Sequence, residues 1–402
     1  MVILILAGVT IDAVFSENGI INKAKEAANS MNNAVANDQT ELNDLLEELN
    51  EIMNSEWNSN IEIPDPEPEK PTDIEDVTEI QDETVQVEDK YGNKVTIPKG
   101  FEVVEEEGTT VPEGIVVQDA NGNQFVWIPV GRVYKDSTGN NYSDIQLGRY
   151  TFSTTDGTPT LVQAAYTEEN LENYKQLVRV NFYNEGYIEY ATRSNPDGIA
   201  SSGSDGLNAI AKDLEGFVNS VKSNEGYYLA RYEASYGSGS SVTDYKPLSK
   251  VSVSTTFSTA TVGSLWNNVT QIEAAKISRN MYSESDNVGV ESDLVNSYAW
   301  DTAIVFIQEM GNTNYANKKS VNTSLMNTGT IGDEVCNIHD MASNCSEFSS
   351  EYSTRSDSEG ANSCNVRGGT VNLNFYCPAY RDGISATDKY AIDGFRPLLY
   401  VR

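Results

Sequence analysis

The sequence predicts an α+β protein, in which a head of short strands, two helices and long loops follows an N-terminal α-helical stem. Two observations carry this prediction. Apolar residues follow a heptad pattern through residues 21–52, and beyond Gly114 the chain is rich in Gly, Ser, Asn and Tyr, with few long periodic segments. A length of 402 residues is enough for two or three units. We expect a hydrophobic helix and stem at 1–57, a linker at 58–83, a small β-hairpin segment at 84–114 and the head domain at 115–402.

The stem begins with an apolar run from Val2 to Val9 that Asp12 ends, well short of the roughly 20 apolar residues that a membrane span needs. A seam with alternating spacings of three and four residues follows, and only its Asp38 is polar. Its members are Ile21, Ala24, Ala28, Met31, Val35, Asp38, Leu42, Leu45, Leu49 and Ile52. Such a seam predicts self-association through the 21–52 helix or packing on a neighbouring helix. The alternative is a single amphipathic helix packed on its own domain.

The residue types in the linker and in the segments after it predict their local structure. Four prolines among acidic residues predict an extended segment at 58–83, because proline stiffens the chain and like charges repel. Alternating apolar residues on both sides of Gly92 predict a hairpin over residues 85–97. A second hairpin is predicted by an apolar strand, an Asn-Gly turn at Asn121 and a following strand through Trp127.

Two helices are predicted in the head. The apolar residues of "GLNAIAKDLEGFVNSVKS", from Leu207 to Val221, keep helical spacing. The segment "SYAWDTAIVFIQEM", 297–310, is apolar on most sides, which predicts a buried helix.

Charge and cysteine content limit the function. The chain has 60 acidic and 27 basic residues, a formal net charge of −33, so a nucleic acid would be repelled and is excluded as a partner. Its four cysteines lie in the last 70 residues. An even number in one region predicts two disulfides and an oxidising compartment, with three connectivities open. Free buried thiols and a metal site are the alternatives. The candidates are Cys336, Cys345, Cys364 and Cys377.

The N-terminal stretch "ILILAGVTIDAVFSENGIINKAKEAA" resembles the first helix of type IV pilin-like and pseudopilin proteins of Gram-positive bacteria. The cleavage site and early glutamate of that family are absent, so we expect an upstream start or a trimmed chain. The resemblance implies an extracellular or cell-surface location, membrane-anchored if an upstream hydrophobic segment exists. It also implies a pilus-like assembly.

The head has a series of motifs in a characteristic order: "FVWIPVG", "EGYYLARYEAS", "LWNNVTQIEAAKIS", "WDTAIVFIQ", "NIHDMASNCSEFSSE", "VRGGTV" and "GFRPLLYV". This order resembles the formylglycine-generating enzyme and sulfatase-modifying-factor family, which implies a C-type-lectin-like fold for the head. The residues that match the motifs of the family are Asn337, Asp340, Met341, Asn344, Glu347, Arg367, Gly368, Gly369, Gly394, Phe395 and Arg396.

A departure from the family bears on catalysis. The copper-dependent oxidases of the family use two cysteines after Arg-Gly-Gly, and the first would fall at Leu373, while Cys377 lies near the second. One thiol cannot supply the pair of thiolates that Cu(I) prefers, so we expect no copper. We therefore expect a non-catalytic head that binds a ligand. A diverged oxidase and an inert minor pilus subunit are the alternatives.

The stretch "VCNIHDMASNCSEF", 335–348, has three interpretations. The family resemblance implies a structural calcium ion held by Asn344 and Glu347, with backbone oxygens. Alternatively, Asn and Asp side chains satisfy loop backbone groups, and the cysteines staple the loop. A Cys336–His339 nucleophile and base is the third interpretation, and no motif surrounds that pair.

A ligand face is expected in the segment 370–393, because C-type-lectin-like domains often bind through the loops before the last strand. Its Tyr, Asn and Arg residues are those of adaptable binding surfaces. The candidates are Asn372, Asn374, Tyr376, Tyr380, Arg381, Asp382 and Tyr390. The expected ligand is a protein or a glycan. Variable proteins of diversity-generating retroelements also share this fold and vary in this stretch, which gives a further alternative.

Overall fold

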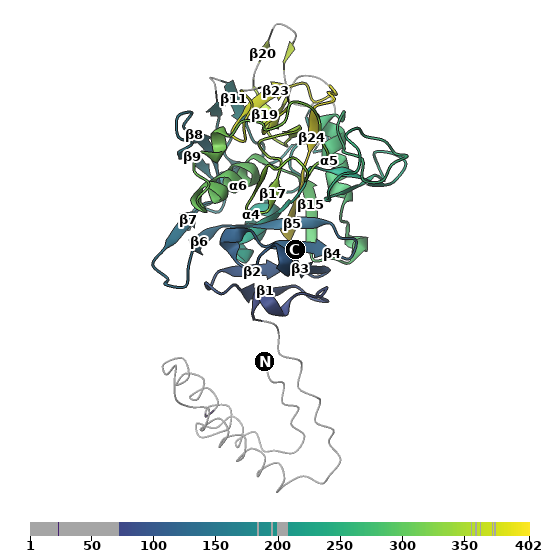
Figure 1. Cartoon of the computed structure of the whole chain (residues 1–402). Coiled ribbons are helices and arrows are strands. Elements are labelled where there is room, and N and C mark those ends of the chain that lie inside the picture. Colours follow the sequence, from purple (N-terminus) through teal and green to yellow (C-terminus); the bar gives the residue numbers. More distant parts are fainter. Residues whose placement is uncertain are drawn as a thin grey trace, which may run out of the picture. The chain divides into compact units, whose positions relative to one another are not determined.

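The computed structural model of the chain contains one compact unit at residues 70–402, whose described residues are drawn in colour in Figure 1. It describes Lys23 and residues 72–402, apart from 183–184, 194–195, 199–207, 355, 358–359, 362, 372 and 374. The predicted heptad stem and the proline-rich part of the linker lie outside the described residues.

A six-stranded antiparallel sheet forms the centre of this unit. Its order is β15 (Val290–Leu294), β25 (Pro397–Val401), β12 (Gly226–Ala230), β5 (Gln124–Pro129), β4 (Val116–Asp119) and β3 (Phe101–Val103). The last strand of the chain therefore lies between strands that start nearly 110 and 170 residues earlier. All residues of β12 and β25 are buried, as expected for strands covered on both faces.

Three α-helices pack around the sheet. α4 (Leu214–Asn224) lies against β12 and β25, and α5 (Gln271–Asn280) lies against β15. α6 (Ser297–Glu309) lies against β5 and also against β8 (Gly148–Phe152), a strand outside this sheet. Each helix begins at a side-chain cap: Asp213, Thr270 and Asn296 accept hydrogen bonds from backbone N–H groups of the first turn. α6 is buried along nearly its whole length, which confirms the prediction for 297–310.

A second sheet at the C-terminal side positions most of the predicted site. Its order is β23 (Arg381–Ile384), β22 (Cys364–Arg367), β18 (Ser346–Phe348) and β24 (Asp393–Phe395), and only the β18–β24 pair is parallel. In Figure 1, β19 (Tyr352–Ser353), β20 (Ser356–Asp357) and β23 lie at the end of the unit opposite to β1 (Val85–Glu88) and β2 (Lys94–Ile97).

The remaining strands form small sheets. They are β1 (Val85–Glu88) with β2 (Lys94–Ile97), β6 (Gly131–Tyr134) with β7 (Tyr142–Ile145), β8 (Gly148–Phe152) with β9 (Pro159–Ala164), β10 (Val180–Phe182) with β11 (Glu185–Ile188) and β19 (Tyr352–Ser353), β13 (Ser235–Ser238) with β14 (Lys246–Leu248), β16 (Glu334–Val335) with β17 (Ile338–His339), and β20 (Ser356–Asp357) with β21 (Gly360–Ala361). The short 3₁₀ helices are η1 (Ile74–Asp76), η2 (Glu105–Glu107), η3 (Val111–Glu113), η4 (Asn173–Lys175), η6 (Glu284–Asp286) and η7 (Tyr315–Asn317).

The predicted α+β class with a helical stem is wrong. The regular elements of the described residues are mostly short strands in many small sheets, with three α-helices and no long N-terminal helix among them. The Gly- and Asn-rich sequence explains this architecture, because frequent turns leave room only for short strands. The helix α5 was not predicted, since its small residues Ala274 and Ala275 give a weak apolar pattern.

The unit also includes more of the chain than predicted. Ile74 and Val77, assigned to the linker, are buried in its core. β3, from the predicted separate hairpin segment, extends the central sheet beside β4. The predicted boundary between 114 and 115 therefore falls inside one compact unit.

Candidate functional site

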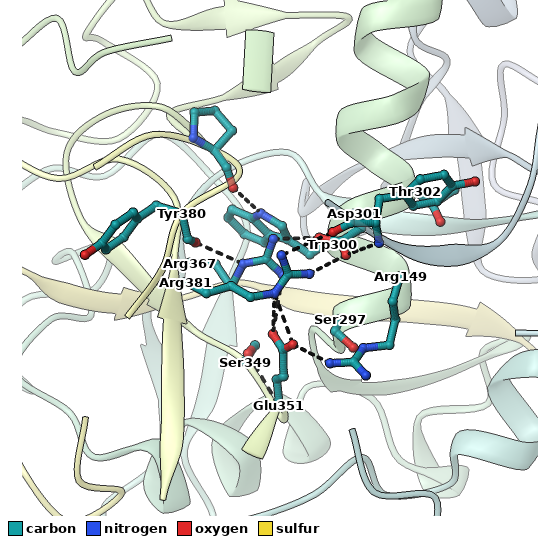
Figure 2. Close-up of polar contacts among 12 residues, drawn as sticks. Arg149, Ser297, Trp300, Asp301, Thr302, Ser349, Glu351, Arg367, Tyr380 and Arg381 are labelled. Atoms are coloured by element: carbon teal, nitrogen blue, oxygen red, sulfur yellow. Dashed lines mark hydrogen bonds and ion pairs between the residues drawn. The ribbon is translucent and has the colours of Figure 1, made fainter. Parts of the chain in front are cut away.

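Five charged side chains from distant parts of the sequence meet in the core of the unit (Figure 2). They are Arg149 on β8, Asp301 on α6, Glu351 after β18, Arg367 on β22 and Arg381 on β23, and none is exposed. Arg149 Nη2 lies 2.7 Å from a Glu351 oxygen, and Arg367 Nη2 lies 2.6 Å from Asp301 Oδ1. Arg381 bridges both carboxylates: it donates to Asp301 and, through Nε at 3.1 Å, to Glu351. This group is called the ion cluster below.

The opposite charges of the ion cluster shift the pKa values of its members. Burial raises the pKa of Glu351, but the charges of Arg381, Arg149 and Arg367 outweigh burial and lower it to about 2. Burial lowers the pKa of Arg381, while Asp301 and Glu351 raise it by more, so the guanidinium stays charged. The ion pairs of the cluster therefore tie β8, α6, β22 and β23 together.

The loop 375–380 is anchored on the outer side of this cluster. The indole Nε1 of Trp300 donates to Pro378 O at 2.8 Å, and Arg367 Nε donates to Tyr380 O at 3.1 Å. The backbone N–H of Ala379 donates to Ala316 O at 3.1 Å. Three hydrogen bonds to buried groups therefore hold the loop in one conformation.

This anchored loop presents three aromatic rings, which we call the aromatic loop cluster: Phe375, Tyr376 and Tyr380. The ring centroids of Tyr376 and Tyr380 lie 4.3 Å apart, and Phe375 lies 5.0 Å from Tyr376 and 5.7 Å from Tyr380. The Tyr376 hydroxyl donates to Asp382. Phe375 is 50% exposed, whereas the two tyrosines are mostly covered. The cluster is thus an apolar platform whose outermost ring meets solvent.

The structure brings some of the predicted ligand residues together and separates others. Tyr376, Tyr380 and Asp382 lie side by side in the aromatic loop cluster or directly beside it. Arg381 does not face a ligand surface, because its side chain is fully buried in the ion cluster. Tyr390 is 48% exposed and lies in another turn, where its carbonyl accepts from the N–H of Asn268. The remaining two candidates, Asn372 and Asn374, lie outside the described residues.

The two predicted calcium ligands are buried and already paired. Both oxygens of Glu347 accept from Arg396, at 2.7 Å and 3.0 Å. The side-chain oxygen of Asn344 accepts from Met326 N–H at 3.0 Å, and its amide group donates to Glu233 at 2.5 Å. A calcium ion at Asn344 and Glu347 remains a prediction. Its binding would require Glu347 to break the ion pair with Arg396. In the described part of the chain, no group of three or more His, Cys, Asp and Glu side chains is arranged to hold a metal.

The cysteines differ from the expectation of two disulfides. All four are free thiols in the structure: Cys364 lies on β22, and the other three lie in loops. Burial raises the pKa of each thiol, that of Cys336 to about 12. The lone histidine, His339, stacks on Tyr232 at 4.7 Å, and burial lowers its pKa to about 4. At neutral pH a protonated thiol is a poor nucleophile, and an imidazole with a lowered pKa is a weak base.

The motif residues of the Arg-Gly-Gly and Gly-Phe-Arg stretches have structural contacts. Arg367 joins the ion cluster, and Arg396 pairs with Glu347 and donates to the carbonyls of Ala230 and His339, both at 2.8 Å. A Cβ at Gly369 would lie 1.8 Å from Ala342 O, so this position has room only for glycine. The motifs therefore position the loops around the site.

The sequence-based prediction did not identify the ion cluster, and it did not include Phe375 in the ligand face. A signal for the cluster was present: Asp301 stands in the middle of an apolar helix, where a carboxylate is expected only if a cation meets it. No such signal marked Arg149. Phe375 was not among the predicted site residues.

No protein-family model, no curated protein and no solved structure matches this chain. Among the described helices, none combines the length and the apolar character that crossing a membrane requires.

Proposed function

We propose that the unit 70–402 is a non-catalytic binding head, and that the aromatic loop cluster is the centre of its ligand face. The observation that carries this proposal is the half-exposed ring of Phe375, supported by two tyrosines on a loop anchored to the buried ion cluster. Aromatic rings gathered on an anchored loop supply the rigid contact area that binding surfaces use.

The anchoring supports binding because it lowers the entropic cost of forming a complex. Pro378 and Tyr380 are held through their carbonyls by side chains of the core, so little ordering remains when a ligand arrives. Tyrosine rings add contact area with few rotatable bonds, and the Tyr376–Asp382 pair offers hydrogen-bonding groups at the rim.

The state of the reactive side chains supports a non-catalytic head. The raised pKa values of the four thiols disfavour thiolates, and the lowered pKa of His339 leaves it a weak base. The relation to the sulfatase-modifying-factor family and the pilin-like surface display belong to this proposal, and they rest on the motifs alone.

The test is a binding screen of the full chain against arrays of glycans and proteins, each run with calcium and with chelator. We expect Phe375→Ala to weaken any specific binding by about tenfold or more, since a buried aromatic anchor contributes about 1.5–3 kcal/mol. Tyr142→Ala is the matched control, because Tyr142 is 44% exposed on β7 and is not in the loop.

Binding that Phe375→Ala and Tyr142→Ala leave equally strong would contradict the proposed face. Binding lost only in chelator, with Phe375→Ala unchanged, would instead place the ligand at a calcium site. Turnover of a cysteine-containing peptide in the presence of copper would contradict the non-catalytic assignment.

A further inference from the structure

The five-residue pattern Asp-x-x-Gly-Asn occurs twice near the start of the unit, at 89–93 and at 119–123. Each copy forms the turn between two paired strands, β1 and β2 for the first and β4 and β5 for the second. In both turns, one aspartate oxygen accepts from the N–H groups two and four residues later, at 2.8–2.9 Å, and the other accepts from the asparagine amide at 2.9 Å. The two turns therefore have the same internal structure.

The two turns differ in what lies beside their glycine. In the second turn, a Cβ at Gly122 would lie 3.4 Å from Nζ of Lys250. In the first turn, a Cβ at Gly92 would meet no atom of the described residues within 4 Å. Gly92 lines a cleft of about 760 Å³, together with parts of β2, β6 and β7 and residues 166–168. Small-molecule sites in proteins have about this volume.

Hydrogen bonds join the first turn to β6. The Asn93 amide donates to Tyr134 O at 2.9 Å, and the Asn93 side-chain oxygen accepts from the Tyr134 N–H at 2.7 Å. Asn93 is buried, so water competes little for these bonds. β6 in turn pairs with β7 along its whole length, from Gly131 opposite Ile145 to Tyr134 opposite Tyr142. The walls of the cleft are therefore preformed, which lowers the entropic cost of binding a ligand.

The charged side chains that line the cleft largely compensate one another. Arg132 Nε lies 3.0 Å from Asp144 Oδ1, its cross-strand partner, and Lys94 Nζ lies 3.9 Å from Glu225 Oε1. The fifth charged residue, Glu168, forms no ion pair within the described part of the chain. Two cations against three carboxylates give a net formal charge of −1. Such a cleft provides no excess positive charge for a phosphate and no strong negative field for a polycation.

The other polar groups of the cleft suit hydroxyl groups. Gln146 is exposed, and its carboxamide has no hydrogen-bond partner among the described residues. A carboxamide donates and accepts, and the carboxylate of Glu168 accepts, so together they complement hydroxyls, which also donate and accept. Tyr134 and Tyr166 are half-buried and add aromatic rings, and the buried Val130 adds an apolar surface. The lining therefore combines hydrogen-bonding groups with surfaces for C–H groups.

We propose that this cleft is a second binding site of the unit and that it holds a neutral saccharide. Saccharides combine the two features that the lining complements, namely an array of hydroxyls and C–H faces that pack on aromatic rings. The inference does not depend on the proposed ligand face. The cleft lies beside β2, β6 and β7, toward the end of the unit opposite to β23 and the aromatic loop cluster that precedes it (Figure 1).

The test is ligand-observed NMR of the full chain with a panel of neutral mono- and disaccharides at up to about 20 mM, followed by titration calorimetry. Glucose 6-phosphate and tetramethylammonium are the charged probes. We expect at least one neutral sugar to bind more tightly than either charged probe. Gln146→Leu should weaken sugar binding about fivefold, because it removes the carboxamide and keeps the size of the side chain. Tyr166→Ala should weaken it about tenfold, because it removes a ring.

Gln86→Leu is the matched control, since Gln86 is exposed on β1 and does not line the cleft. The melting temperature of each variant distinguishes lost binding from unfolding, and Gln146→Leu decides the outcome if Tyr166→Ala does not fold. No sugar binding at about 20 mM would overturn the inference. Tighter binding of either charged probe, or equal sugar binding by Gln146→Leu and Gln86→Leu, would also overturn it.

The two proposed sites fail in different ways. If sugar binding falls in Phe375→Ala but not in Gln146→Leu, the sugar lies at the aromatic loop cluster and the inference about the cleft is wrong. If sugar binding falls in Gln146→Leu but not in Phe375→Ala, the cleft is supported, and the proposed ligand face must then be judged by its other ligands.

Discussion

Removing the negative charge of Glu351 tests whether the ion cluster holds the site together. In the variant Glu351→Gln, the side chain keeps its shape, but Arg149 and Arg381 lose the carboxylate that they contact at 2.7 Å and 3.1 Å. Arg367 and Arg381 would then keep Asp301 as their carboxylate partner, while Arg149 would keep only its hydrogen bonds to backbone carbonyls. Every one of these side chains is fully buried, so water cannot replace the lost partner.

The expected loss follows from the burial. Breaking a buried ion pair by removal of one partner costs about 3–5 kcal/mol, a large share of a typical unfolding free energy of roughly 5–15 kcal/mol. With an unfolding entropy of about 2.1 cal/mol/K per residue, a unit of roughly 330 residues would melt about 4–7 °C lower. Chemical denaturation and calorimetry of the full chain would measure both quantities.

The pH dependence gives an independent check. The pKa of Glu351 is lowered to about 2 in the folded state, whereas an unfolded glutamate titrates near 4.5. Its stabilising contribution is therefore complete above about pH 4.5 and is lost as the pH falls toward 2. The difference in stability between the wild-type chain and Glu351→Gln should narrow over this window.

Glu309→Gln is the control, because Glu309 is 41% exposed and its lysine partner is 3.8 Å away. We expect that variant to lose less than about 1 kcal/mol. A loss of under about 1 kcal/mol in Glu351→Gln would refute the argument, since the buried cations would then not depend on this carboxylate.

Three other predictions concern the surroundings of the site. Asp393→Asn should flatten the pH profile of stability, because burial raises the pKa of Asp393 to about 7. The wild-type chain should lose up to roughly 4 kcal/mol of unfolding free energy as the pH rises from about 4 to 7. An equal dependence of the unfolding free energy on pH in both chains, measured by urea titration, would contradict this. Gly369→Ala should cost several kcal/mol or prevent folding, since its Cβ would lie 1.8 Å from Ala342 O, and near-wild-type melting would contradict the steric argument. Trp300→Phe should cost about 1–3 kcal/mol by leaving Pro378 O without its donor, and amide exchange at Ala379 should speed up; unchanged exchange would show that the loop does not need this anchor.

Local structure could be predicted from the sequence wherever turn residues and apolar periodicity agree. The hairpin of β1 and β2 forms around Gly92, and β4 pairs with β5 across Gly122, as predicted, because glycines with positive φ fit these turns. The helix α6 follows from its apolar composition, and α4 follows in part, since it starts only at Leu214. These features depend on neighbours within a few residues.

The fold class and the composition of the site were not predictable in the same way. Strand β25 pairs with β12 and β15, which start roughly 170 and 110 residues earlier, and no local pattern encodes that pairing. The class was mispredicted because the stem and two helices were given more weight than many short strands.

The sequence by itself determined the hairpins, the buried helix and the strongly acidic character of the chain, because these depend on neighbouring residues or on composition. Only the tertiary structure decided which polar residues face solvent. Arg381 was assigned to a binding surface and lies instead in the core beside Asp301 and Glu351, while Phe375 of the same segment points outward. The physical reason is that a buried charge is stable only where opposite charges from distant strands and helices reach it, and the chain brings them together only when it folds.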